Sequence, residues 1–243
     1  MKKIIEVGIQ QFKKPKIKQI SFVENNKEVN SLLSDIEHKP HAFVLGCLMD
    51  RQVKADRAWI IPKIVFDELK TSDINELAEK SLKEYEDIFS KKTLHRFNDD
   101  MAKVFYDGVQ DIKRKYEGDA SKIWRGKPSS ALVVYRFLEF RGCGIKIATM
   151  AANILAKQFK IEFADYYSID ISPDVHVMRV MERMGCVSKG ASREMVIYKA
   201  RELYPIFPGI IDSSCWEIGR KWCKSENPNC DECSARSECK KNI

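Results

Sequence analysis

The sequence predicts an all-α protein, on three observations. Apolar residues recur at intervals of three and four over several stretches, which is the period of an amphipathic helix. Residues 42–49 are almost all apolar and suit a helix at the centre of a helical domain. No stretch shows the sustained alternation of apolar and polar residues, bounded by turn signals, that is typical of half-buried strands.

Size and charge limit the possible functions. A chain of 243 residues can form one large domain or two small ones, and 44% hydrophobic residues can bury a sizeable core. The formal charge of +7 favours anionic partners. No apolar run approaches the ~20 residues of a membrane helix, and the short, broken apolar stretch at the N-terminus is not typical of a signal peptide. We therefore expect a cytoplasmic protein that does not bind membranes.

The first half of the chain contains several expected helices. Residues 1–20 hold six lysines and one acid, which suits either a basic arm on phosphate or a solvated surface segment. Residues 24–38 are polar and suit a linker or a short helix. In the apolar stretch 58–66, Pro62 should start or kink a helix. An amphipathic helix is expected over residues 74–89, with Ser72 before it as a candidate cap.

A helix from about residue 99 to 116 should stop at Gly118, a residue type that commonly ends helices. Two more helices, over residues 131–138 and up to about Gln158, enclose a turn that contains Gly142 and Gly144. Such glycines let the backbone bend tightly and present N–H groups at a helix N-terminus, which can bind a DNA phosphate independently of sequence. An ordinary connection between helices would show the same pattern.

The C-terminal region contains a dense group of cysteines. Cys223, Cys230, Cys233 and Cys239 are separated by six, two and five residues. So short a loop cannot build its own apolar core, so metal–thiolate binding would have to supply folding energy. Structural zinc sites usually use two close ligand pairs on separate knuckles, whereas four cysteines on one loop suit a 4Fe–4S cluster.

A disulfide-rich tail is the other interpretation of this loop, but nothing else in the chain suggests export. The remaining cysteines each lie beside apolar residues; they are Cys47, Cys143, Cys186 and Cys215. Lone thiols together with a metal-binding loop fit a reducing cytosol.

The cysteine spacing resembles the iron–sulfur loop of the endonuclease III family of DNA base-excision glycosylases. The turn around Gly142 resembles that family's helix-hairpin-helix motif, although Arg141 stands where proline is usual and Ile145 where a basic residue is common. Residues 172–184 resemble the family's Val-Asp-Thr-His-Val-x-Arg-Val segment. The interval between the last two motifs is longer than usual, which indicates an insertion within 161–171.

The resemblance covers about residues 40–243 and implies a two-lobed helix-hairpin-helix glycosylase fold. A six-helix barrel lobe would span residues 40–165 and contain the hairpin. Residues 1–39 together with 166–243 would form a cluster lobe that carries the four-cysteine loop.

The resemblance assigns catalytic roles to two residues. Lys146 falls on the family's Schiff-base lysine, whose neutral amine attacks the sugar C1′ and expels the damaged base. Asp174 falls on the carboxylate that stabilises the oxocarbenium-like sugar and helps to position or deprotonate the amine. By themselves, these residues have simpler interpretations: a surface lysine near phosphate, and an acid after Ser172 and Pro173 that complements the dipole of a first helical turn.

Contacts to DNA are also implied. Gln52 would enter the gap left by a flipped nucleotide, although a polar helix end is an equally simple interpretation. Gly142 and Gly144 would bind phosphate, and Lys224 would present a basic side chain from the cysteine loop. Leu48 stands where the adenine-removing branch of the family carries a catalytic glutamate, which argues against that branch.

We therefore expect a monomeric base-excision repair enzyme that acts on double-stranded DNA with a damaged base and carries a structural 4Fe–4S cluster. It would be a bifunctional DNA glycosylase and apurinic/apyrimidinic (AP) lyase, with an oxidised pyrimidine as the default substrate. Alternatives are a monofunctional glycosylase for alkylated or mismatched bases, a non-catalytic iron–sulfur DNA-binding protein, and a zinc-loop RNA-binding module. Trp124, Tyr166 and Tyr167 could stack on a base, but each also suits core packing.

Overall fold

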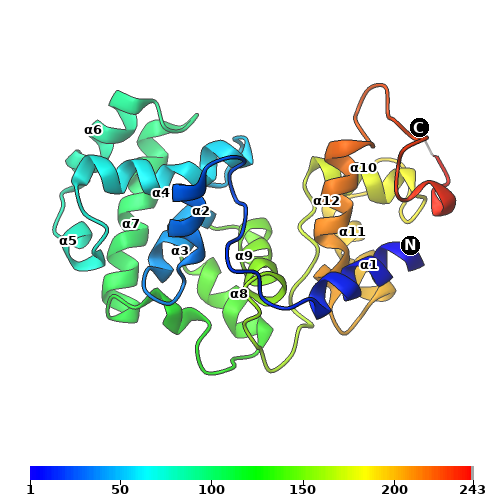
Figure 1. Ribbon diagram of the computed structural model, residues 1–243, viewed down its shortest axis with the longest axis horizontal. Helices are drawn as coiled ribbons and strands as arrows, with labels where there is room; N and C mark the ends of the chain where they lie inside the picture. Colours follow the sequence, from blue (N-terminus) through cyan, green and yellow to red (C-terminus); the bar gives the residue numbers. More distant parts are fainter. Residues whose placement is uncertain (242–243) are drawn as a thin grey trace. The chain divides into compact units, whose positions relative to one another are not determined.

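The computed structural model describes residues 1–241, and that part contains helices, turns and irregular segments but no strand (Figure 1). This confirms the predicted all-α class. The α-helices are α1 (Lys2–Lys13), α2 (Lys27–Ser34), α3 (Pro40–Met49), α4 (Ala55–Leu69), α5 (Ile74–Ala78), α6 (Leu82–Lys92), α7 (Asn98–Tyr116), α8 (Ser130–Leu138), α9 (Ile145–Lys157), α10 (Val175–Arg183), α11 (Arg193–Leu203) and α12 (Asp212–Lys221). Three short 3₁₀ helices are η1 (Ala120–Ile123), η2 (Pro208–Ile211) and η3 (Arg236–Glu238).

The chain divides into two compact units. Unit 1 comprises Met1–Lys16, Pro128–Val134 and Ala148–Ile243, and unit 2 comprises Ile17–Lys127 and Tyr135–Ile147. Helices α8 and α9 each contribute residues to both units.

This division differs from the one expected at residues 40 and 166. Residues 17–39 belong to unit 2 because α2 packs on α3 and α4, where Leu33 is fully buried. Residues 148–165 belong to unit 1, since α9 is bonded to η2 by Asn153 and Lys157.

Helix α3 lies at the centre of unit 2. All ten of its residues are buried, as the apolar run predicted, and it packs against α2, α4 and α7. Two glycines make room for this packing. A Cβ atom at Gly46 would lie 2.8 Å from the Trp59 ring on α4, and one at Gly108 on α7 would lie 2.9 Å from Leu48.

Residues 74–89 form two helices, so the single helix expected there is wrong. Ser81 begins α6 with a capping box, in which its backbone N–H donates to Glu84 Oε2 at 2.8 Å and its side chain accepts from the Glu84 N–H. Asp73, rather than Ser72, caps α5 by accepting from the Asn75 N–H at 2.8 Å. The chain breaks here because each cap binds N–H groups that lack a partner within their own helix.

Unit 1 is built around α9, η2 and α12. Asn153 donates to the Gly209 carbonyl at 2.8 Å, and the buried Lys157 amine donates to the Ile210 carbonyl at 2.9 Å and to Ser213 Oγ at 2.7 Å. Burial lowers the pKa of Lys157 to about 8. These bonds fix η2 against the second half of α9.

The lysine-rich N-terminus is a helix within unit 1, not an extended arm. Helix α1 packs on η2 and α12, and a Cβ atom at Gly8 would overlap the Ile210 carbonyl. The N-terminal ammonium group of Met1 lies 2.5 Å from Glu238 Oε2, which connects the start of the chain to the segment of the last cysteine.

The three candidate stacking residues have different environments. Trp124 is buried, with its ring edge-on to Phe43 at 6.2 Å. Tyr166 stacks on Phe207 at 5.1 Å within an aromatic cluster. Trp124 therefore serves as core and Tyr166 is half-buried, whereas Tyr167 is 62% exposed.

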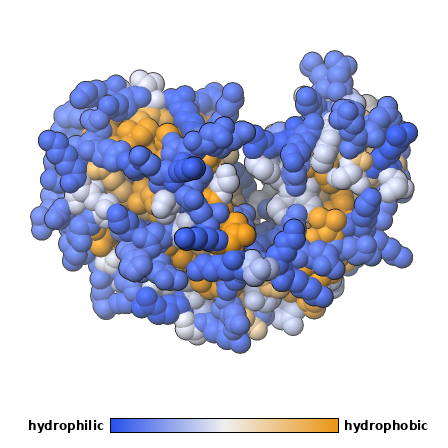
Figure 2. Space-filling view, in the orientation of Figure 1, coloured by the Kyte–Doolittle hydropathy of each residue, from blue (hydrophilic) through white to orange (hydrophobic). Residues whose placement is uncertain are grey.

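The surface is largely polar. Hydrophilic residues cover most of the face shown in Figure 2, and hydrophobic residues gather in a few patches. Among residues 1–241, no helix combines the length and apolar character needed to cross a membrane.

The capping box allows a first prediction. Ser81→Ala removes the side-chain acceptor at the start of α6 and should lower the free energy of unfolding by about 1 kcal/mol, measured by urea denaturation. Ser90→Ala, at an exposed position inside the same helix, is the matched control and should not destabilise the protein. An equal loss in both variants would contradict the proposed cap.

Candidate functional site

The turn between α8 and α9 has the geometry that its glycines predicted. The Phe140 carbonyl accepts from the Cys143 N–H at 3.1 Å, and Gly142 has φ +78° at the third turn position, where glycine is favoured. A Cβ atom at Gly142 would also lie 3.0 Å from Val104. The exposed Gly144 directly precedes α9, so a helix N-terminus follows the turn at once. Phosphate binding at Gly142 and Gly144 stays a prediction.

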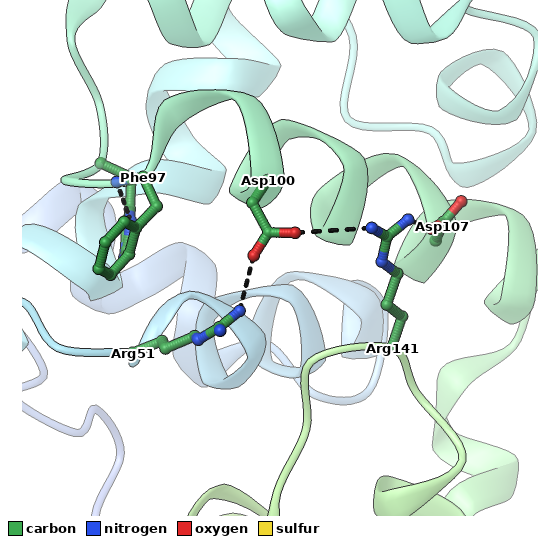
Figure 3. A network of polar contacts seen from close by, with 6 residues as sticks. Arg51, Phe97, Asp100, Asp107 and Arg141 are labelled. Carbon is green, nitrogen blue, oxygen red and sulfur yellow. Dashed lines mark hydrogen bonds and ion pairs between the residues drawn. The ribbon is translucent and has the colours of Figure 1, made fainter.

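Arg141 stands in this turn where proline is usual, and its ion pairs connect the turn to α7. Arg141 donates to Asp107 Oδ2 at 3.0 Å and lies 3.5 Å from Asp100 Oδ1, both on α7 (Figure 3). Asp100 also accepts from Arg51, directly after α3, at 2.7 Å. Because these side chains are partly exposed, each pair contributes at most about 1 kcal/mol. Their effect is mainly to position the turn relative to α7 and the end of α3.

Lys146 lies in the first turn of α9, next to this glycine turn. Its Nζ donates to Asp50 Oδ2 at 2.6 Å, and the two side chains are 39% and 11% exposed. Asp50 occupies the C-cap position of α3. The sequence analysis missed this partner. A carboxylate at the carboxyl end of a buried helix, where the helix dipole disfavours it, was the signal that could have indicated it.

Three titratable groups near this pair, Cys47, Cys143 and His95, are neutral near pH 7. Burial raises the pKa of the Cys47 thiol well above its ordinary value, and Cys143 and Asp50 raise it further. Burial also raises the pKa of Cys143 to about 12. His95 faces the backbone of Met49, and burial lowers its pKa below the ordinary value.

Gln52 lies in the turn between α3 and α4, two residues after Asp50. It is exposed and has φ 56°, in the left-handed region that side chains other than glycine seldom occupy. Such strained residues cluster at functional sites. The position of Gln52 therefore suits the predicted insertion of its side chain into DNA, and this insertion stays a prediction.

Asp174 is itself the N-cap of α10, whereas the simpler interpretation made Ser172 the cap and placed Asp174 within the first turn. Its Oδ1 accepts from the His176 and Val177 N–H groups, both at 2.9 Å. The preceding backbone is fixed as well, because the Ser172 N–H donates to Asp212 Oδ1 at 2.7 Å. Lys146 belongs to unit 2 and Asp174 to unit 1, and their pairing stays a prediction.

The other end of α10 holds the cysteine loop. Arg179 Nε donates to the Cys223 carbonyl at 2.6 Å. Arg183 donates to the Lys224 and Ser225 carbonyls at 2.6 and 2.9 Å. One helix thus carries Asp174 at its start and fixes the beginning of the loop at its end. Lys224 itself is exposed, as a DNA contact requires.

The four loop cysteines line a single cavity. Burial raises the pKa of the Cys233 thiol, and the three other thiols add to this effect, so the four side chains lie near one another. Apolar side chains form much of the remaining wall, namely Val180, Met184, Ile218, Trp222, Pro228 and Ala235.

Four thiols around one largely apolar cavity are a donor set that fits an iron–sulfur cluster. Within residues 1–241, no group of three or more histidine, cysteine, aspartate or glutamate side chains is arranged to hold a metal ion as it stands. The cluster and its four ligands stay a prediction.

Comparisons with known proteins place this geometry in context. No family model matches the chain. Over 69 residues it is 33% identical to endonuclease III of Thermotoga maritima, a match that spans 28% of this chain and 32% of that relative.

The chain is similar over 99% of its length to a trapped endonuclease III–DNA covalent intermediate, covering 94% of that chain with a TM-score of 0.63 and 18% identity. It has the endonuclease III fold. A thermostable thymine-DNA glycosylase gives a TM-score of 0.64 at 11% identity, covering 98% of this chain and 94% of that one. An 8-oxoguanine glycosylase/lyase of Clostridium acetobutylicum gives 0.55 at 15% identity, over 75% and 60% of the two chains. These findings confirm the predicted fold and the resemblance to the endonuclease III family.

The Arg141 network leads to a second prediction. Arg141→Ala removes both ion pairs to α7 and should weaken binding to undamaged duplex DNA several-fold, measured by fluorescence anisotropy. Arg141→Pro should retain the affinity, because proline fixes the backbone of this turn position without the ion pairs. Equal weakening in both variants would mean that the guanidinium contacts DNA itself.

Proposed function

We propose that this protein is a DNA base-excision repair glycosylase with AP lyase activity, in which Lys146 is the nucleophile. The observation that carries the proposal is the Lys146 amine, which is partly exposed, lies directly after the glycine turn and contacts a carboxylate. This arrangement combines a helix N-terminus, which is suited to bind an anion, with an amine that contacts a possible proton acceptor. The similarity to endonuclease III over 69 residues, and the shared fold, support the assignment.

The proposed reaction requires a nucleotide swung out of the duplex, because C1′ cannot be reached within the stack. The neutral Lys146 amine forms a bond to C1′, and the electron pair of the C1′–N bond leaves with the damaged base. The sugar ring then opens as the C1′–O4′ bond breaks and the amine nitrogen passes a proton to O4′, which leaves an imine between Lys146 and C1′. Loss of a proton from C2′ then expels the 3′ phosphate by β-elimination, which cuts the strand. Asp174 would stabilise the positive charge on the sugar, and Gln52 would occupy the space left in the duplex.

The cysteine loop would hold a 4Fe–4S cluster through Cys223, Cys230, Cys233 and Cys239. When bound, the cluster would supply folding energy to a loop that has little apolar core of its own. Arg179 and Arg183 would keep the loop on α10, and Lys224 would then face DNA as a basic side chain.

An oxidised pyrimidine is the substrate that we propose, on the resemblance to endonuclease III. A panel of duplexes, each with one lesion, tests it: release of oxidised pyrimidines ahead of alkylated or mismatched bases is expected. Preference for a mismatched thymine or for 8-oxoguanine would assign a different substrate to the same site.

A monofunctional glycosylase is the second candidate, and one observation favours it. The 2.6 Å contact between Lys146 and Asp50 suits a charged lysine that only neutralises phosphate. In that case base release would occur without strand cleavage or a covalent adduct.

A third prediction separates the two candidates. Borohydride added to the protein on duplex DNA with an AP site should trap a covalent adduct, and Lys146→Gln should abolish it. Asp174→Asn should slow trapping by roughly 100-fold or more. Lys122→Gln, a surface lysine of unit 2, is the control and should trap as the wild type does. No adduct with the wild type would remove the lyase assignment, and an adduct that survives Lys146→Gln would remove Lys146 as the nucleophile.

A fourth prediction concerns the cluster. The purified protein should be brown, and Cys230→Ser should lose the visible absorption and lower the thermal unfolding temperature. Cys186→Ser changes a cysteine of unit 1 that does not line the cavity and should keep the colour. A colourless protein that binds one zinc ion would contradict the iron–sulfur assignment.

A further inference from the structure

The Lys146–Asp50 pair brings together two charges that are each unfavourable where they stand. Asp50 places a negative charge at the carboxyl end of α3, and Lys146 places a positive charge in the first turn of α9. Each opposes its helix dipole. Their contact at 2.6 Å offsets both conflicts. Charges that oppose a helix dipole, and that are compensated by a contact with an opposite charge, are expected at functional sites.

The two partners differ in mobility. Asp50 is 11% exposed and follows a fully buried helix, and its N–H donates to the Cys47 carbonyl at 3.1 Å. Lys146 has a long side chain and is 39% exposed. The carboxylate is therefore the fixed member of the pair, and it determines where the amine is held.

We propose that Asp50 positions the Lys146 amine and accepts its proton when bound DNA excludes water from the pair. This inference rests on the proposed function. In water, the ammonium and carboxylate forms are both stabilised by hydration, whereas exclusion of water disfavours both charges. A proton then moves from Nζ to Oδ2, so that one N–H bond breaks and one O–H bond forms. The pair keeps zero net charge, and the amine gains the lone pair that attack on C1′ requires.

The titratable side chains nearest the pair do not change charge between about pH 7 and pH 9, so they do not mask the effect of Asp50 on a pH profile. Cys47 and Cys143 are neutral thiols up to at least pH 9, and His95 is neutral above pH 7, because burial shifts each pKa away from that range. Arg51, which adjoins Asp50, is paired with Asp100. Lys157, at the other end of α9, has a pKa that burial lowers to about 8, and it titrates in this range in every variant. Only the difference in pH profile between the wild type and the Asp50 variants therefore reports the role of Asp50.

The fifth prediction is a single-turnover experiment. Borohydride trapping on a duplex with an AP site is measured across that pH range for the wild type, Asp50→Asn and Asp50→Glu. At pH 7, Asp50→Asn should trap roughly 100-fold more slowly than the wild type, because the amine must lose its proton to bulk water. Its rate should rise about tenfold for each pH unit, whereas the wild-type rate changes little. Asp50→Glu keeps a carboxylate and should keep the flat profile.

The matched control is Asp67→Asn. It removes the carboxylate from the exposed Lys63–Asp67 pair on α4, which also has an N–O distance of 2.6 Å and lies in the same unit. Its trapping rate should equal that of the wild type at every pH. Thermal unfolding of each variant shows whether a lost rate reflects lost structure. If Asp50→Asn does not fold, the profile of Asp50→Glu decides, and a steep profile there overturns the proposal.

Other outcomes separate this inference from the proposed function. Trapping by Asp50→Asn that equals or exceeds the wild-type rate at pH 7 would mean that the carboxylate only restrains a charged lysine, and the inference fails. If Lys146→Gln abolishes trapping in the same experiment, the proposed nucleophile still stands. An adduct that persists in Lys146→Gln would instead defeat the proposed function.

Discussion

Complete burial of α3 is the constraint on which the candidate site of unit 2 depends. A helix packed on every side cannot rotate or slide without opening the core, so the residues just after it are held rigidly. The next three residues of the chain have different contacts; they are Asp50, Arg51 and Gln52. The first contacts Lys146, the second binds Asp100, and the third is exposed in a left-handed turn.

Unit 1 uses α10 in a comparable way. Asp174 caps the helix at one end, while Arg179 and Arg183 bind the backbone of the cysteine loop at the other. Close packing of α10 on α12 requires Gly219, because a Cβ atom there would lie 2.7 Å from His176. The segment 172–184, which resembles the endonuclease III pattern, thus packs α10 against α12 and also supplies the Asp174 carboxylate. A single rigid helix links the position of Asp174 to the integrity of the loop.

Both units place candidate functional groups at helix ends that packed helices position. Helix ends carry backbone groups without intrahelical partners, so they bind charged groups and tolerate unusual backbone conformations. The ion pairs of Arg141 show that a turn can be held by side chains of α7 instead of by a proline ring. The departure of this chain from the usual hairpin sequence therefore leaves the turn geometry intact.

The sequence by itself determined the helical class, the position of several helices before residue 158, the glycine turn and the cysteine spacing, because these depend on residues close together in the chain. It also contained the Ser81–Glu84 cap that divides α5 from α6, but the apolar period continues across that break and conceals it. Only the tertiary structure decided that Asp50 meets Lys146, 96 residues later. No local pattern encodes such a contact, since it arises from where packing places the end of one helix and the start of another.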